Sequence, residues 1–175
     1  MQRKLRVGVA GAGHKGWPGG VYSQLFHSHP RTEVVAICDI NEKRLEDAGK
    51  ELNLKENQLF TSYDDFINSD IDIVVIATPM PFHAEQTIKA MESGKHVLCE
   101  LTAATTIEDC NRVFNAVKKA KKVYMMAENY SYFHYIREWK KIIDEGKLGK
   151  IFYAEGEYIH EIRDLLVDEK TGEKF

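Results

Sequence analysis

Short apolar runs alternate with longer amphipathic stretches along most of this sequence. Runs rich in Val and Ile predict buried strands at residues 5–10, 33–38, 58–61, 72–77, 96–100 and 123–127. Between them, helical spacing of apolar positions predicts helices at residues 21–29, 41–52, 63–68, 81–93 and 106–120. Strands that are apolar at nearly every position belong to sheets covered on both faces. The pattern therefore predicts an α/β fold, a doubly wound parallel sheet of the Rossmann type.

The pattern changes after residue 127. Residues 128–133 are polar and aromatic and indicate a loop, residues 134–145 predict a helix, and residues 150–160 predict a long strand. This second part is too short to bury a core of its own. We therefore expect a dinucleotide-binding domain at residues 1–127. Residues 128–175 would be the truncated beginning of an α+β domain for substrate binding and oligomerisation.

Composition narrows the classes of partner. Apolar residues make up 43% of the chain, charged residues 29%, and the net charge of -3 argues against a nucleic-acid surface. No apolar stretch approaches the roughly 20 residues that span a bilayer, so no membrane partner is expected. Three scattered cysteines give neither a disulfide framework nor metal-ligand spacing. These features favour the cytoplasm and predict no metal.

A GxGxxG pattern lies between the first predicted strand and the first predicted helix. Its glycines allow a tight turn, a close approach of the backbone to pyrophosphate, and close packing of helix on strand. A glycine-rich turn without a ligand is the alternative, and the insert at residues 17–20 delays or distorts the helix start. We expect a dinucleotide to be held by the loop residues Gly11, Gly13, His14, Lys15 and Gly16.

An acidic residue, Asp39, ends the second predicted strand, 23 residues after Gly16. A carboxylate there accepts hydrogen bonds from the adenosine ribose and repels a 2′-phosphate, so NAD is expected rather than NADP. Arg44 on the next helix would soften that preference. The alternative for Asp39 is a helix cap or a turn.

Three further stretches carry a family resemblance: residues 74–79 followed by His83, residues 90–100, and residues 147–151. With the glycine loop, they make the whole chain resemble the Gfo/Idh/MocA oxidoreductases, the family of glucose–fructose oxidoreductase and inositol dehydrogenase. The resemblance implies about half of a usual member, a sugar or polyol substrate, and a homo-oligomer at full length. It also implies further cofactor-binding residues, namely Thr78, Pro79, His83, Glu100 and Asn129. His83 as a helix cap, and residues 128–130 as an interdomain hinge, are the alternatives.

The chain departs from the family at its Glu-Lys-Pro signature, where it has Glu100, Leu101 and Thr102. Leucine cannot donate the proton that the family's lysine is credited with moving. This departure, and residues 156–165, resemble a branch that includes NAD-dependent glycosidases. A strand there places Tyr158 and His160 on one face, and both are candidate catalytic residues. The alternative is a Tyr/His pair that only packs against another part of the protein.

Three functions remain open. The first is an NAD-dependent oxidoreductase acting at a carbinol carbon of a sugar or polyol, with His160 and Tyr158 in place of the lysine. The second is a glycosidase that uses NAD transiently, through oxidation and elimination. The third is a nucleotide-binding fragment without catalytic activity. Net formation of NADH distinguishes the first from the second.

Overall fold

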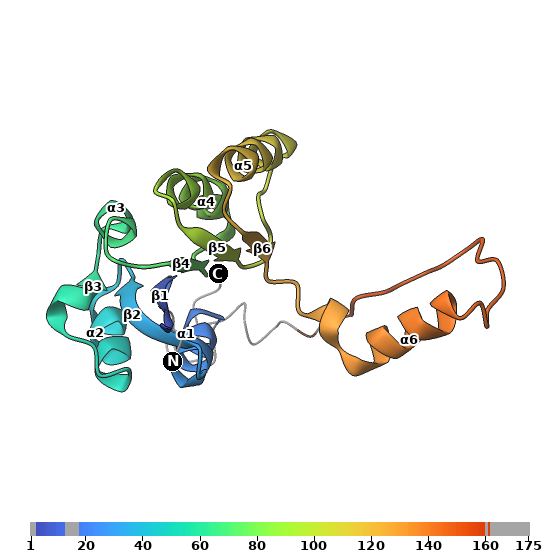
Figure 1. Cartoon of the computed structure of the whole chain (residues 1–175), viewed down its shortest axis with the longest axis horizontal. Coiled ribbons are helices and arrows are strands. Elements are labelled where there is room, and N and C mark those ends of the chain that lie inside the picture. Colours follow the sequence, from blue (N-terminus) through green and yellow to red (C-terminus); the bar gives the residue numbers. More distant parts are fainter. Residues whose placement is uncertain (1–2, 13–17, 160, 162–175) are drawn as a thin grey trace. The chain divides into compact units, whose positions relative to one another are not determined.

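The computed structural model describes residues 3–12, 18–159 and 161, and the chain divides into two compact units after Asn129. The first unit is a six-stranded parallel sheet in the order β3-β2-β1-β4-β5-β6 (Figure 1). This confirms the predicted doubly wound α/β fold. Its strands are β1 (Leu5–Ala10), β2 (Thr32–Cys38), β3 (Leu59–Phe60), β4 (Ile73–Ile76), β5 (His96–Cys99) and β6 (Tyr124–Met126).

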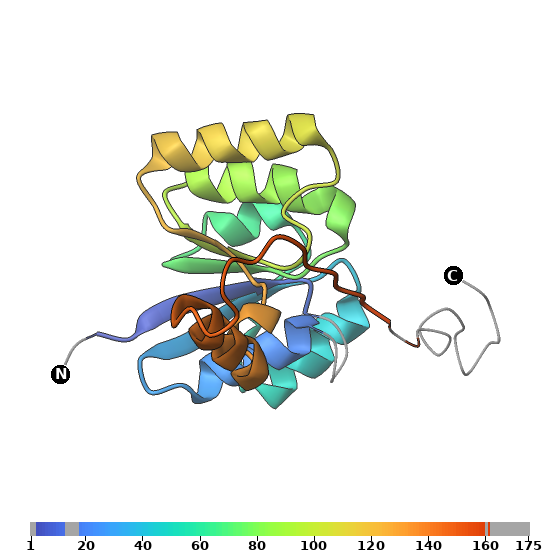
Figure 2. The ribbon, with the colours of Figure 1, turned by 90° about the vertical axis from the view of Figure 1, so that its right-hand side faces the viewer.

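Helices cover both faces of the sheet (Figure 2). One face packs on α1 (Pro18–Ser28) and α2 (Glu42–Glu51), and the other on α3 (Tyr63–Ile67), α4 (His83–Glu92) and α5 (Ile107–Ala120). Side chains of the central strand β4 alternate between the two sides. Val74 and Ile76 join the cluster under α3, α4 and α5, and Val75 joins the cluster on α1 and α2. This two-sided burial explains the nearly continuous apolar runs in the sequence.

Short polar side chains begin several of these helices. The Asn41 side chain accepts a hydrogen bond from the Arg44 N–H at the start of α2, and Thr106 accepts one from the Asp109 N–H at the start of α5. Helix α1 begins at Pro18, three residues earlier than the apolar pattern predicts. Proline is well suited to a first helical turn because it has no N–H to leave unpaired. Single turns at η1 (Glu56–Gln58) and η2 (Met80–Phe82) precede β3 and α4.

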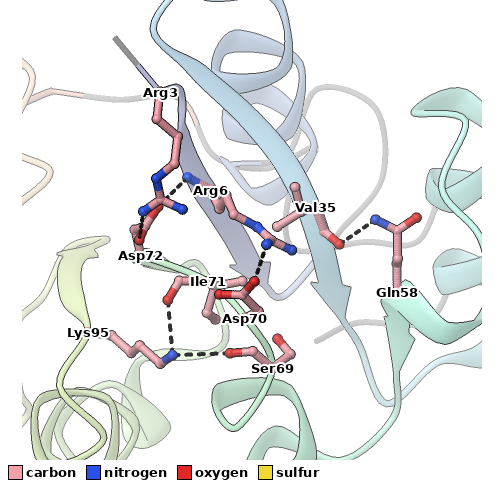
Figure 3. A network of polar contacts seen from close by, with 9 residues as sticks. All are labelled: Arg3, Arg6, Val35, Gln58, Ser69, Asp70, Ile71, Asp72 and Lys95. Carbon is pink, nitrogen blue, oxygen red and sulfur yellow. Dashed lines mark hydrogen bonds and ion pairs between the residues drawn. The ribbon is translucent and has the colours of Figure 1, made fainter.

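A polar network ties together the amino ends of β1, β4 and β5 (Figure 3). The Asp72 carboxylate accepts hydrogen bonds from the Arg6 backbone N–H at 2.8 Å and the Arg3 guanidinium at 2.7 Å. The Lys95 ammonium donates to the carbonyl oxygens of Ser69 and Ile71, at 3.1 and 3.0 Å. These bonds hold the segment that leads into β4. They lie at the amino ends of the strands, opposite the carboxyl ends.

The second unit contains η3 (Tyr130–Tyr132) and α6 (His134–Asp144). The strand predicted over residues 150–160 was wrong where the structure describes it, because residues 151–159 are in neither strand nor helix. A strand exists only when another strand pairs with its backbone, and the described part of this unit offers no such partner. The strand face expected to carry Tyr158 and His160 is therefore not formed here, and His160 lies outside the described residues.

Candidate functional site

A cavity of about 510 Å³ opens at the carboxyl ends of the strands in the first unit. It lies where β1 and β4 are neighbours although they are not consecutive, so the strand order reverses there. Doubly wound sheets bind dinucleotides at this reversal. The residues that line it are Gly11, Gly19, Cys38, Asp39, Ile40, Arg44, Thr61, Tyr63, Ala77, Thr78, Pro79, Phe82, His83, Gln86, Glu100 and Leu101.

Two glycines bring α1 against the end of β1. Gly11 has a positive φ of 81°, and a Cβ built on it would lie 2.4 Å from the Ala77 carbonyl oxygen. A Cβ on Gly19 would lie 1.6 Å from the Gly11 carbonyl oxygen, so the first turn of helix α1 packs directly against the backbone at Gly11. No other residue fits these two positions. The helix N-terminus, which favours phosphate, consequently stands at the edge of the cavity.

The carboxylate of Asp39 stands just after β2 on one side of the cavity. The residue is only 9% exposed, and one of its oxygens accepts a hydrogen bond from the Asn41 N–H at 2.9 Å. Arg44 from α2 also lines the cavity. This arrangement offers ribose hydroxyls a fixed carboxylate, in a cavity that also contains a cationic side chain.

The segment after β4 is held by side chains of α4. The Thr78 hydroxyl donates to the Gln86 side-chain oxygen at 2.6 Å. The His83 ring is 1% exposed, with Nε2 at 2.6 Å from the Thr78 carbonyl oxygen and Nδ1 at 2.7 Å from the Thr102 carbonyl oxygen. Thr78, Pro79 and His83, all expected at the cofactor, therefore meet on this wall of the cavity.

Glu100 follows β5, and its two carboxylate oxygens have different donors. The Tyr22 hydroxyl from α1 donates to Oε1 at 2.6 Å, and the Leu101 N–H donates to Oε2 at 2.9 Å. Burial, and then the hydrogen bond to Glu100, raise the pKa of Tyr22 well above its ordinary value. Tyr22 thus remains a donor across the neutral range. Leu101, 37% exposed, contributes an apolar side chain beside this carboxylate.

Gly19, Tyr22 and Gln86 hold parts of this site and were not among its predicted residues. Gly19 lay in the insert noted as distorting the start of the helix, which was a usable signal. Tyr22 and Gln86 have helical spacing toward the sheet. Their partners Glu100 and Thr78 come from other segments, 78 and 8 positions away. No local pattern identifies such contacts.

Other residues singled out from the sequence are not brought to this cavity. Asn129 is exposed at the end of the first unit and does not line it. Tyr158 belongs to the second unit, where its ring packs edge-on against Tyr130 with the ring centres 5.7 Å apart. The loop residues Gly13, His14, Lys15 and Gly16 lie outside the described residues, as His160 does. Their proposed roles stay predictions.

Within the described ranges, no group of three or more His, Cys, Asp or Glu side chains could hold a metal ion. The same part of the chain has no helix long and apolar enough to cross a membrane. What the cavity offers is a glycine-lined turn at a helix start, a carboxylate on each side, and an apolar wall. These features fit a dinucleotide.

Comparison with known proteins agrees with this reading of the cavity. Residues 5–128 match the family model GFO_IDH_MocA, described as an oxidoreductase family with an NAD-binding Rossmann fold. Over 96% of its length, the chain is 34% identical to a glycosyl hydrolase family 109 protein of Shewanella baltica. It spans 38% of the length of that relative.

Solved structures of dehydrogenases have the same fold. Myo-inositol 2-dehydrogenase from Lactobacillus plantarum aligns with a TM-score of 0.77 and 30% identity, covering 86% of this chain and 44% of that one. The WlbA dehydrogenase from Bordetella pertussis, in complex with NADH and UDP-GlcNAcA, aligns with a TM-score of 0.78 and 29% identity, covering 86% and 45%. The present chain thus corresponds to less than half of each.

Proposed function

The chain belongs to the Gfo/Idh/MocA oxidoreductase family, with its NAD-binding Rossmann domain, and from this premise we propose that the protein transfers hydride between NAD and a sugar or polyol. One observation carries the proposal. Asp39 and Glu100 line one cavity but follow strands on either side of the β1–β4 pair. A dinucleotide laid across that pair has its adenosine ribose at Asp39 and its nicotinamide half beside Glu100 and Leu101.

The residues that would hold NAD are those of the glycine turn, Asp39, and the walls formed by Thr78, Pro79, Glu100 and Leu101. Bound NAD supplies the hydride acceptor at the carbinol carbon. The chain supplies orientation, an apolar wall at Leu101 that excludes water, and a carboxylate fixed by Tyr22. Leu101 cannot carry the alcohol proton, so we assign proton transfer to His160, assisted by Tyr158.

A glycosidase is the second candidate, and two specific observations favour it. Leu101 stands at the position of the family's lysine, and the relatives named glycosyl hydrolase family 109 proteins match nearly the whole chain. In this chemistry, oxidation of one sugar carbon acidifies the neighbouring C–H, a base removes that proton, and the aglycone leaves. Water would then add to the unsaturated ketone at the carbon that the aglycone left, and return of the hydride to the ketone would give the free sugar, so NADH would not accumulate.

The substrate class, the cellular compartment and the assembly of the protein are part of the same proposal. The names of similar solved structures, a myo-inositol 2-dehydrogenase and a WlbA dehydrogenase in complex with UDP-GlcNAcA, suggest a polyhydroxylated small-molecule substrate. Cys38, Cys99 and Cys110 are free thiols, two of them buried, as is usual in a reducing compartment such as the cytoplasm. A homo-oligomer is the assembly that we expect.

The experiment has two stages. Calorimetry with NAD and NADP first asks whether the chain binds a dinucleotide, and an absence of NAD binding contradicts the whole proposal. Polyols, sugars and nitrophenyl glycosides are then incubated with NAD and any longer natural form of the chain. Appearance of NADH supports the dehydrogenase, release of nitrophenol without net NADH supports the glycosidase, and NAD binding without either supports a non-catalytic nucleotide-binding protein.

A further inference from the structure

The imidazole of His83 joins three segments of the first unit. It begins α4, it is 1% exposed, and both of its ring nitrogens lie against backbone carbonyl oxygens. Nε2 is 2.6 Å from the carbonyl of Thr78, just after β4, and Nδ1 is 2.7 Å from the carbonyl of Thr102, in the loop after β5. Among the described residues of the site, no other side chain is hydrogen-bonded to the backbone carbonyls of two different segments.

The chemistry of these contacts points to a mechanical role. A neutral imidazole has one N–H and donates to one of the two oxygens, and a protonated imidazole donates to both. A donor on the ring that bonds to one of these carbonyls restrains the segment that carries it. With both nitrogens occupied by the backbone, the ring has no atom left to bind substrate or to carry a proton to it.

The loop that His83 contacts contains the residues expected nearest to the reaction. Glu100 begins it and is held from the other side by the Tyr22 hydroxyl at 2.6 Å. Leu101 lies between these two attachments and lines the cavity. Thr102, whose carbonyl faces His83, also closes a turn through its hydroxyl, which donates to the Ala104 carbonyl at 2.8 Å.

We propose that His83 is a positioning residue that ties the loop Glu100–Thr102 to the end of β4 and thereby shapes the half of the cavity that receives the nicotinamide. The inference rests on the proposed function for the identity of that ligand. The adenosine half lies toward Asp39, on the far side of the β1–β4 pair, so the attachment at His83 should affect one half of the dinucleotide and not the other.

Three variants of the 175-residue chain test the attachment. His83→Ala removes both contacts. His83→Asn keeps a donor at the position of Nδ1, facing Thr102, and His83→Gln keeps one at the position of Nε2, facing Thr78. His96→Ala is the matched control. It removes a partly buried histidine from β5 at the opposite end of that strand, where its ring accepts a hydrogen bond from the Val123 N–H.

Two measurements are made on each variant. Calorimetry compares NAD with ADP-ribose, which has the adenosine half and the pyrophosphate but no nicotinamide. Hydrogen exchange of residues 100–104 in the free chain reports the attachment of the loop without any ligand. We expect His83→Ala to weaken NAD binding about tenfold, with ADP-ribose unchanged within about twofold, and to speed exchange of the loop about tenfold. His83→Asn should restore most of the NAD affinity and most of the slow exchange of the loop, and His83→Gln should restore little of either.

The proposal is overturned by any of three results. In the first, His83→Ala resembles His96→Ala in NAD affinity and in loop exchange. In the second, NAD and ADP-ribose lose affinity together, which means that the histidine only supports the fold. In the third, Gln restores the loop and Asn does not. Should His83→Ala fail to fold, the comparison of Asn with Gln decides alone. A parent chain that binds neither ligand contradicts the proposed function, and loop exchange still tests the attachment.

Discussion

Both carboxylate oxygens of Glu100 already accept a hydrogen bond, and this limits what the residue can do in the site. One carboxylate oxygen accepts from Tyr22 and the other from the Leu101 N–H. Tyr22 does not lose its proton near neutrality, because burial and this hydrogen bond raise its pKa. A carboxylate held at both oxygens is suited to orienting a neighbouring group. The leucine at position 101 cannot itself carry a proton.

Asp39 should select the cofactor. Its carboxylate is almost buried and accepts a hydrogen bond from the Asn41 N–H, so a 2′-phosphate brought beside it meets a fixed negative charge. We expect NAD to bind at least about tenfold more tightly than NADP, and Asp39→Ala to reduce that ratio to about two or less. Calorimetric titration of both cofactors measures it. Asp47→Ala, on the exposed side of α2, is the control and should leave the ratio unchanged. Equal affinities in the parent chain would rule out this role.

Gly19 should be indispensable for docking α1. An alanine Cβ there would lie 1.6 Å from the Gly11 carbonyl oxygen, so the helix must move away from the turn. Overpacking of this kind typically costs about 1–3 kcal/mol. We expect Gly19→Ala to lower the free energy of unfolding by about that amount and to weaken NAD binding, measured by urea denaturation and calorimetry. Gly156→Ala has open space around its Cβ and is the control. A Gly19→Ala protein as stable as Gly156→Ala would refute the close contact.

At the scale of elements, the stabilising polar network lies at the amino ends of the strands, and the cavity lies at their carboxyl ends. The network around Asp72 joins the amino ends of β1 and β4, and the cavity opens at their carboxyl ends (Figure 3). Stabilising groups can therefore be changed without touching ligand-binding ones. This separation makes the network a place to measure stability alone.

Asp72 should make the fold sensitive to acid. Partial burial acts to raise the pKa of Asp72, but the hydrogen bonds from the Arg6 N–H and from Arg3 outweigh it, and the pKa falls below 3.8. A carboxyl whose pKa is lower in the folded state stabilises the fold above its unfolded pKa, and that contribution is lost as the pH falls. We expect Asp72→Asn to lower the free energy of unfolding by about 1–2 kcal/mol at pH 7, with NAD affinity unchanged.

The check is urea denaturation across the acid range. The difference between parent and Asp72→Asn should be full well above pH 3.8 and shrink as the pH drops below it. Asp70→Asn is the control, because its side chain is 78% exposed and its ion pair with Arg6 should contribute little. A difference that does not depend on pH would mean that the charge of Asp72 is not what stabilises the strands.

Elements were predictable from the sequence where burial is two-sided, and not where a distant partner decides. The apolar runs of β1 and β4 and the glycines between β1 and α1 were sufficient to predict the sheet and the place of its cavity. The contact of Tyr22 with Glu100 joins positions 78 apart, and nothing local indicates it. Residues 151–159 have the composition of a strand, but a strand needs a partner that the described chain does not contain.

At the scale of the molecule, the cavity and the residues proposed for proton transfer belong to different units. Among the described residues, all those that line the cavity belong to the first unit, which ends at Asn129. Tyr158 belongs to the second unit, and His160 falls in the same part of the chain. The two functions should therefore be separable by mutation, since the first unit holds the cofactor and the second is expected to supply the acid–base group.

Replacing His160 by Ala should stop turnover without loosening the cofactor. A lost general acid or base costs roughly 10²–10⁴-fold in rate, and we expect a reduction of that size in turnover. The Kd for NAD should change by less than about twofold, because the cavity residues that the structure describes lie in the first unit. The measurements are turnover of a panel of polyols and nitrophenyl glycosides, and calorimetry with NAD on the same preparations.

The prediction is tested by comparing turnover with NAD affinity in the same variants. His134→Ala, at the start of α6, is the matched control, because it removes a histidine from the second unit where no acid–base role is expected. A His160→Ala protein that turns over like His134→Ala would leave His160 as a packing residue. A loss of NAD affinity in parallel with turnover would mean that the second unit helps to hold the cofactor. A selective loss of turnover supports His160 as the group that takes over from the absent lysine.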